Sequence, residues 1–261
     1  MRAERPPVLF VVLATVGVAF FVLPLAGLVY RAPWETALSD LTSSEAITAL
    51  RLSFVVSIAA TALALLLGIP LAWIYARVAF PGRDIARALT TLPMILPPVV
   101  GGVALLFAFG RRGLFGQALD SMFGIRLPFT TAGAVLAATF VAMPFLVLTV
   151  EAGLRSMDRR YEDAARTLGA GRWVVFRRVT LPLVAPSIFA GAVLSWARAL
   201  GEFGATITFA GNLPGTTQTL PLAVYIALET RPEVAIMLSL VLLAISLAIL
   251  VGMRDRYLRA F

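Results

Sequence analysis

The strongest constraint on the fold is a series of six long apolar sequence intervals, of which five contain no charged residue between their ends and one contains two. About 20 apolar residues cross the hydrocarbon core of a bilayer, and a charge at its centre costs roughly 2.5 to 3.5 kcal/mol on insertion scales. Hydrophobic residues make up 60% of the 261 residues and charged residues only 14%. We therefore expect an all-α polytopic membrane protein with six transmembrane helices. The intervals lie at Arg5–Arg31, Arg51–Arg77, Arg87–Arg111, Arg126–Glu151, after Arg178, and at Glu233–Arg254.

The fifth interval differs from the others because two charged residues interrupt it. Arg198 and Glu202 are four residues apart, so they share one helical face and can form an ion pair. Ionisable residues at membrane depth mark either a packed ion pair or a translocation path, and both interpretations stay open here. Gly201 and Gly204 flank Glu202 and favour close helix approach or a local hinge. Residues 211–219 are polar and are expected to form an external loop.

The distribution of arginine predicts the orientation of the chain. All 22 basic residues are arginine, and the net charge is +8. An N-terminus in the cytoplasm places fifteen of them in cytoplasmic segments and six in external ones, which satisfies the positive-inside rule. Both termini and the 155–178 loop are then cytoplasmic, and topology explains the charge without a nucleic-acid partner. The first interval is too long for a signal-peptide core, so we expect a retained helix.

The missing residue types exclude several chemistries. The chain has no lysine, histidine or cysteine. A phosphate-binding Walker A loop needs its lysine, so this kind of nucleotide site is excluded. Histidine or cysteine metal ligation, cysteine nucleophiles and disulfides are excluded as well. We expect neither a metal site nor a catalytic site in this chain.

Proline and glycine interrupt the spans repeatedly. The third carries Pro93, Pro97 and Pro98, followed by Gly101 and Gly102, and the other spans contain Pro70, Pro144 and Pro186. A proline inside a helix frees a backbone carbonyl, which protein or a water-filled cavity must satisfy. Such a cluster favours a pathway or a moving element, although ordinary helix bending explains any single proline.

A polar stretch, Tyr161–Pro182, separates two apolar segments. It predicts a short helix that docks onto a partner, with alanines and a glycine that allow close approach. Its arginines are expected to form a basic face, and its large apolar residues are expected to fill a groove in the partner. The basic residues are Arg166, Arg172, Arg177 and Arg178, and the apolar ones are Leu168, Trp173, Val174, Val175 and Phe176.

The spacing within this stretch resembles the cytoplasmic-loop signature of ATP-binding-cassette (ABC) importer permeases. That signature is E-A-A, three residues, G, nine residues, I-x-L-P. Here Asp163-Ala164-Ala165 is followed by Gly169 and, after nine intervening residues, by Val179, with Leu181-Pro182 in register. The resemblance implies a coupling helix at about 158–172 that sits in a groove of an ATPase subunit. The coupling residues it implies are Asp163, Ala164, Ala165, Arg166, Leu168, Gly169 and Trp173.

Further motifs resemble the permease subunit of molybdate importers, with sulfate and tungstate permeases as close relatives. They are LPMILPPVVGG, the GRRG at 110–113, AARTLGAGRW and LGEFGATITFAGNLPGTTQTLPLAVY. The similarity covers roughly residues 45–253, which is the expected transmembrane domain. Residues 1–44 would be a variable N-terminal helix with an external loop, and residues 254–261 a cytoplasmic tail.

The resemblance implies the type I ABC importer fold in the cytoplasmic membrane of a prokaryote. It also implies a homodimer, two copies of a separate ATPase that holds ATP and Mg, and an extracytoplasmic oxyanion-binding protein. This chain would bring molybdate, or tungstate, inward by alternating access without a cofactor or enzymatic activity of its own, and a sulfate or thiosulfate permease is the alternative. An inward-facing resting state would close the outer end of the path near 202–208. The implied path and gate residues are Arg198, Glu202, Phe203, Gly204, Thr206, Thr208, Pro97 and Pro98.

A tetrahedral dianion is costly to desolvate, so its path needs hydrogen-bond donors. Arg198, backbone amides at broken helices, and external Arg111 and Arg112 are candidate donors. Two other classes stay open. An ion-driven secondary transporter would use intramembrane carboxylates, of which only Glu202 is evident, and a membrane-embedded enzyme would need a carboxylate cluster or a nucleophile with its base.

Overall fold

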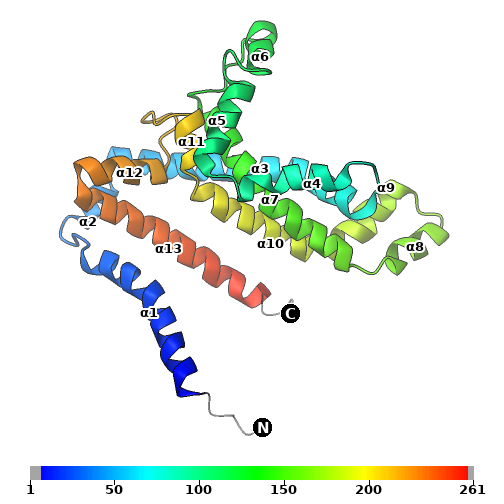
Figure 1. Cartoon of the computed structure of the whole chain (residues 1–261), viewed down its shortest axis with the longest axis horizontal. Helices are drawn as coiled ribbons and strands as arrows, with labels where there is room; N and C mark the ends of the chain where they lie inside the picture. The colour runs from blue at the N-terminus through cyan, green and yellow to red at the C-terminus, as the bar shows by residue number, and fades with distance from the viewer. Residues whose placement is uncertain (1–6, 258–261) are drawn as a thin grey trace.

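The computed structural model describes residues 7–257, with side chains through residue 252, and this part of the chain is helical without strands (Figure 1). Arg2, Arg5 and the end of the expected tail lie outside the described residues. The helices are α1 (Val8–Tyr30), α2 (Ala37–Leu41), α3 (Ser44–Arg77), α4 (Arg83–Thr91), η1 (Leu92–Met94), α5 (Pro98–Phe109), α6 (Gly116–Phe123), α7 (Thr131–Ser156), α8 (Arg160–Thr167), α9 (Arg172–Val175), η2 (Phe176–Thr180), α10 (Leu181–Leu200), α11 (Gly204–Phe209), α12 (Leu220–Thr230) and α13 (Pro232–Tyr257).

Five helical segments are long and apolar enough to cross a membrane, and a bent pair brings the number to six. The spans in α1, α3, α7 and α13 match expected intervals. The remaining single span, Arg172–Leu200, corresponds to the expected fifth interval and runs from α9 through α10. That span ends at Leu200, between Arg198 and Glu202, so the charges that marked it as unusual lie at a real break.

The third interval is not one straight span. Arg83–Met94 and Pro98–Phe109 meet at a bend of 118°. Pro97 and Pro98 both lack an N–H, and the residue before a proline avoids the helical conformation, so the helix stops and restarts here. The proline cluster therefore produces a sharp break that turns α5 away from α3, α7 and α10 (Figure 1).

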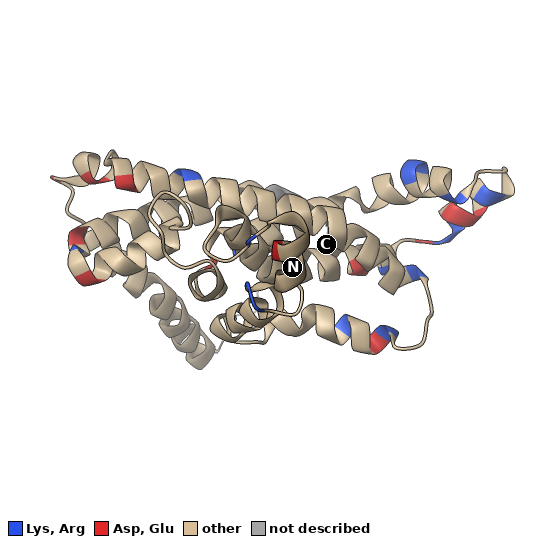
Figure 2. Ribbon diagram, turned by 90° about the horizontal axis from the view of Figure 1, so that it is seen from above, with Lys and Arg blue, Asp and Glu red and all other residues tan. Residues whose placement is uncertain are grey.

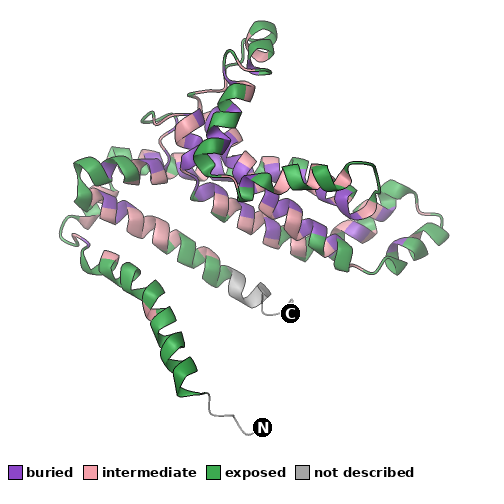
Figure 3. Ribbon diagram, viewed as in Figure 1, coloured by how far each residue is buried: buried purple, intermediate pink, exposed green. Residues whose placement is uncertain are grey.

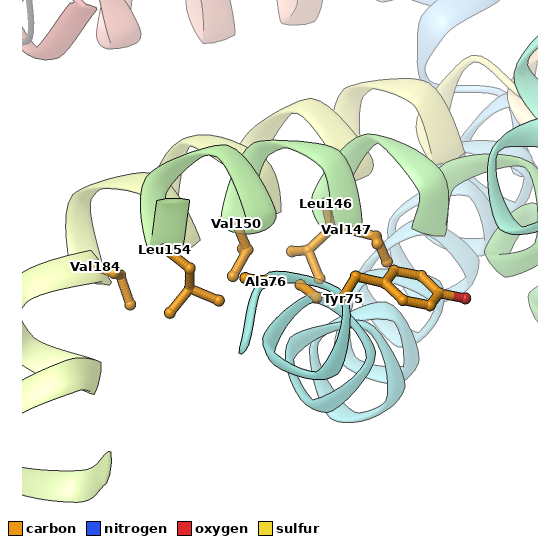
Figure 4. Close-up of a cluster of buried hydrophobic side chains, with 8 residues drawn as sticks. Tyr75, Ala76, Leu146, Val147, Val150, Leu154 and Val184 are labelled. Carbon is orange, nitrogen blue, oxygen red and sulfur yellow. The ribbon is translucent and has the colours of Figure 1, made fainter. Parts of the chain in front are cut away.

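The core lies between α3, α7 and α10 (Figure 3). One half is built from small residues, among them Ala60, Ala138 and Ala142, which are fully buried and let the backbones approach closely. The other half is larger in side-chain volume, and Figure 4 shows its members facing one another from the three helices. These are Ala72, Tyr75, Ala76, Leu146, Val147, Val150, Leu154 and Val184, all but Ala72 labelled in the figure. In contrast, α1 has no buried residue.

Charged residues gather at the two ends of the long helices, and most of the length between them is free of charge (Figure 2). Many of the described arginines lie at the end that carries α8 and α9. This separation is what a bilayer-spanning bundle requires, because charges at mid-span are costly.

Candidate functional site

The loop between α7 and α10 folds as a helix, a glycine turn and a second short helix. Asp158 Oδ1 accepts a hydrogen bond from Arg160 N at 2.9 Å at the start of α8. At its end Gly169 has φ +84°, a left-handed conformation that L residues rarely adopt. Gly169 N donates to Arg166 O, and Ala170 N donates to Ala165 O, at 2.9 and 3.0 Å. These two bonds form a Schellman motif, so the helix expected over 158–172 ends at Thr167 and restarts at Arg172.

The predicted coupling residues share one solvent-accessible region, which we call the docking surface. Leu168 is 89% exposed and Trp173 is 70% exposed, large values for apolar side chains. Asp163 and Arg166 form an exposed pair across one turn of α8, at 3.3 Å. The docking surface consists of Asp163, Ala164, Ala165, Arg166, Leu168, Gly169 and Trp173, all exposed except Ala165, which is half-buried.

Two of the residues expected to fill a partner's groove pack inside the protein instead. Val175 is buried, and Phe176 is half-buried between two tryptophans. The Phe176 ring stacks on Trp173 with centroids 5.7 Å apart and meets Trp73 of α3 edge-on at 6.3 Å. Phe176 therefore fixes Trp173 to the bundle. The prediction that Val175 fills a partner's groove is wrong because Val175 is 3% exposed, and for the half-buried Phe176 it stays a prediction.

Sequence reasoning missed Glu162, the buried residue of α8. Its Oε1 accepts a hydrogen bond from Thr180 Oγ1 at 2.7 Å, and Arg77 Nη2 lies 3.5 Å from the same oxygen. Glutamate on a short polar helix is ordinarily exposed, so the sequence offered no signal beyond its place next to Asp163.

A second ion cluster lies near the same end of the bundle. Glu151 of α7 is 1% exposed and contacts Arg155 at 2.7 Å and Arg87 of α4 at 3.0 Å. Arg155 also donates to Tyr75 O, and the Tyr75 hydroxyl lies 2.8 Å from Thr90 Oγ1. These contacts hold α4 to α3 and α7, although α4 has no buried residue of its own.

The predicted path residues surround the break between α10 and α11. Arg198 and Glu202 form the expected ion pair, with Nη1 and Oε2 2.6 Å apart. The other carboxylate oxygen accepts a hydrogen bond from Ala205 N at 2.8 Å. Glu202 is 3% exposed, so one buried carboxylate both neutralises an arginine and caps the start of α11.

Close packing joins α11 to the break before α5. A Cβ placed on Gly204 would lie 2.8 Å from Pro98 Cβ, and one on Gly102 would lie 2.6 Å from Thr208 Cβ. Both contacts are too short for any side chain, so these positions require glycine. The structure thus packs Pro98 against Gly204 and Thr208 against Gly102, while Thr206 is buried and both Pro97 and Pro98 stay exposed.

The expected hydrogen-bond donors are largely occupied within the chain. The Ala205 amide at the broken helix serves Glu202, and Arg198 is paired with the same carboxylate. Outside the spans, Arg111 Nε and Arg126 Nε contact the two oxygens of Asp120 at 3.2 and 2.9 Å. The Arg126 hydrogen bond in particular holds the pKa of Asp120 below its usual value.

Comparison with known proteins identifies the family. Residues 64–259 match the family described as binding-protein-dependent transport system inner membrane component. The chain belongs to this family. As a permease it is a transport component, and its long apolar helices make it a multi-pass membrane protein.

The permease is similar over most of its length to several molybdenum permeases. It is 45% identical to the molybdenum transport system permease protein ModB of Mycobacterium tuberculosis, over 93% of this chain and 92% of that relative. It is 48% identical to ModB of Escherichia coli, over 70% of this chain and 80% of that relative. The sulfate transport system permease protein CysT of Salmonella typhimurium is more distant, at 37% identity over 87% and 83% of the two chains.

Solved structures with the same fold include an ABC transporter that imports the acidic polysaccharide alginate. Its TM-score is 0.73 at 19% identity, and the match covers 97% of this permease and 95% of that chain. A structure of a bacterial alginate transporter with a periplasmic protein bound to alginate pentasaccharide gives a TM-score of 0.72, also at 19% identity, over 96% of this permease and 94% of that chain. The type I importer fold expected from the sequence is confirmed.

Proposed function

We propose that this permease is the membrane-spanning subunit of an ATP-driven importer that carries molybdate into the cytoplasm. The observation that supports this most directly is the 45% identity to a molybdenum permease over 93% of the chain. The matched region covers most of the chain, which includes most or all of the docking surface and of the broken helices, the two regions that a transport cycle would use. The sulfate permease, at 37% identity, makes sulfate the alternative anion.

The energy source of the importer is a separate ATPase. A chain without lysine has no Walker A loop of its own, so ATP and Mg belong to that subunit. The docking surface fits such a partner because Leu168 and Trp173 are held out into solvent by the Schellman turn and by Phe176. A large exposed apolar side chain at the tip of an ordered loop is typical of an anchor for a groove in another protein.

The assembly we propose is a homodimer with two ATPase copies in the cytoplasm and an oxyanion-binding protein outside. The arginine-rich end with α8 and α9 then faces the cytoplasm, as do both termini. ATP-driven closure of the ATPase pair draws the two docking surfaces together. The helices rotate, the outer gate opens toward the binding protein, and hydrolysis reverses the movement.

The path would run along the break formed by Pro97, Pro98 and the α10–α11 junction. Residues 202–208 close its outer end in the resting state. Arg198 contributes positive charge there, and its pairing with Glu202 limits how tightly it holds a dianion. This suits a permease that must release its substrate and leaves selection to the binding protein.

The test is ATP hydrolysis by the permease reconstituted in vesicles with its candidate ATPase. Hydrolysis and uptake are measured with binding protein that is empty or loaded with molybdate, tungstate or sulfate. We expect loaded binding protein to stimulate hydrolysis and molybdate to be taken up. A Gly169→Glu variant, which places a charged side chain in the docking surface, should lose both the ATPase and the stimulation.

Other outcomes would overturn parts of the proposal. Stimulation by sulfate alone would name the alternative anion. Uptake that continues without any ATPase would indicate an ion-driven transporter. Failure of any ATPase to associate with the wild type would contradict the function assigned to the docking surface.

A further inference from the structure

The helix that carries most of the docking surface has one firm attachment to the membrane spans. Within α8 every residue except Glu162 is exposed or half-buried, and the helix stands away from the bundle (Figure 1). The aromatic contacts of Trp173 and Phe176 anchor α9, which lies beyond the Gly169 turn. Movement of α8 must therefore reach the spans either through Glu162 or along the backbone turns at its two ends.

Glu162 is joined to two different core helices. Thr180 is the last residue of η2 and leads directly into α10, and Arg77 is the last residue of α3. Both contact the same carboxylate oxygen, at 2.7 and 3.5 Å. A single side chain thus connects α8 to the ends of α3 and α10, two of the three helices that form the core.

The connection is shielded from water. The side chains of Arg77 and Glu162 are 8% and 6% exposed, and Thr180 is 1% exposed. Hydrogen bonds that involve a charged group are strongest in such surroundings, and the carboxylate has no solvent to replace a lost partner. The contact is therefore rigid compared with the exposed Asp163–Arg166 pair on the same helix.

The segment that receives Glu162 is a π-helical turn, Phe176–Thr180. Short π-helical turns inside α-helices are rare and occur frequently at functional sites. Here the turn lies between α9, which carries Trp173, and α10, which leads to Arg198. A displacement of Thr180 would act at the start of the span that ends at the path.

We propose that Glu162 is the positioning residue that transmits movement of the docking surface to α3 and α10. It acts by holding α8 to Thr180 and Arg77, and it makes no contact with the ATPase itself. This inference rests on the proposed function and assigns the transmission to one buried carboxylate rather than to the exposed signature residues Asp163 to Gly169.

The experiment uses the full complex with ATPase and loaded binding protein, and compares Glu162→Ala with Thr180→Val. Thr180→Val removes the hydroxyl donor with little change in side-chain volume, whereas Thr180→Ser keeps a hydroxyl donor at this position. Glu45→Ala controls for the loss of a carboxylate–arginine pair as such, because Glu45 forms an exposed pair with Arg231 at 2.6 Å far from the docking surface. ATPase affinity, melting temperature, hydrolysis and molybdate uptake are measured for each.

We expect Glu162→Ala and Thr180→Val to retain the ATPase with wild-type affinity. The molybdate transported per ATP should fall about tenfold, the effect of losing one hydrogen bond to a charged group. Thr180→Ser and Glu45→Ala should transport as the wild type does. A merely structural role would lower the melting temperature and leave the ratio of transport to hydrolysis unchanged.

Two results would overturn the inference. One is an unchanged transport ratio in both Glu162→Ala and Thr180→Val, and the other is loss of ATPase binding in a variant that still melts normally, which would make Glu162 a docking residue. Failure of the proposed function is distinguishable, because the wild type itself would then show no stimulated hydrolysis.

Discussion

Substitution of Gly169 tests why glycine is needed at this position: because of its backbone conformation or because a side chain would clash. Its φ is +84°, and a Cβ built there meets no atom within 4 Å. A steric clash within the chain therefore contributes nothing, and the penalty for another residue is that of the left-handed conformation itself. For an L residue this is about 1 to 2 kcal/mol, and asparagine tolerates the conformation better than alanine.

The penalty should appear as weaker ATPase binding. In the undocked loop the exposed turn at Gly169 can relax without disturbing the buried Glu162 contact, whereas the docked loop must keep the turn. Gly169→Ala should therefore raise the Kd for the ATPase by about 5- to 30-fold, the equivalent of 1 to 2 kcal/mol. Gly169→Asn should bind more tightly than Gly169→Ala, although its side chain is larger.

The assay is a binding titration of the ATPase against the permease in lipid nanodiscs. The order of affinity should be glycine, asparagine, alanine, with Gly169→Glu weakest because it adds charge and bulk at the contact. If asparagine binds no better than alanine, the ATPase surface rather than the backbone selects glycine, and the conformational reasoning is refuted. Wild-type affinity in Gly169→Ala would refute it as well.

Three other predictions concern the path and the external loop. Glu202→Ala leaves Arg198 without its partner and the start of α11 uncapped, and should lower the free energy of unfolding by about 3 kcal/mol. This is the low end for a broken buried pair, because Arg198 is partly exposed. Denaturant titration measures the change, and Glu202→Gln should lower the free energy of unfolding by less. Gly204→Ala forces a Cβ against Pro98 and should destabilise by about 1 to 3 kcal/mol in the same assay, and a neutral effect would contradict the close packing. The pKa of Asp120 is lowered, so its pairing with Arg126 stabilises the segment 110–126 fully above the ordinary aspartate pKa of about 4. This stabilisation is lost as the pH falls through the lowered pKa. Proteolysis of the segment should therefore increase only at acid pH in the wild type, and already at neutral pH in Asp120→Asn.

The spans were predictable because bilayer energetics acts on each residue separately. Charge-free intervals mark helices such as α3 and α7 without any knowledge of their neighbours. The 118° bend was not predictable, because the cluster at Pro97 and Pro98 shows where a helix can break but not which way it turns. That direction depends on packing against α11 through Gly102 and Gly204.

The site was predictable where a local pattern sets the geometry. Arg198 and Glu202 pair because residues four apart share a helical face, and Gly169 ends α8 because its conformation favours glycine. Burial on the loop was not predictable. Phe176 lies in a stretch where the large apolar residues Leu168 and Trp173 are exposed, and Glu162 is of a residue type that is usually exposed. Contacts with Trp73 and Thr180 of other elements turn them inward.

The lack of any buried residue in α1 has a consequence for how the permease responds to membrane thickness. A helix of 23 residues is about 35 Å long, whereas the hydrocarbon core measures about 30 Å. Packed helices take their tilt from their neighbours, but among the described residues α1 makes only sparse contact with α13, so hydrophobic mismatch has the larger share in setting its tilt. In a thinner bilayer α1 would lie flatter while α3, α7 and α10 keep their angles. The short connection through α2 would then absorb the difference, and lipid composition would act on the permease first at its N-terminal helix.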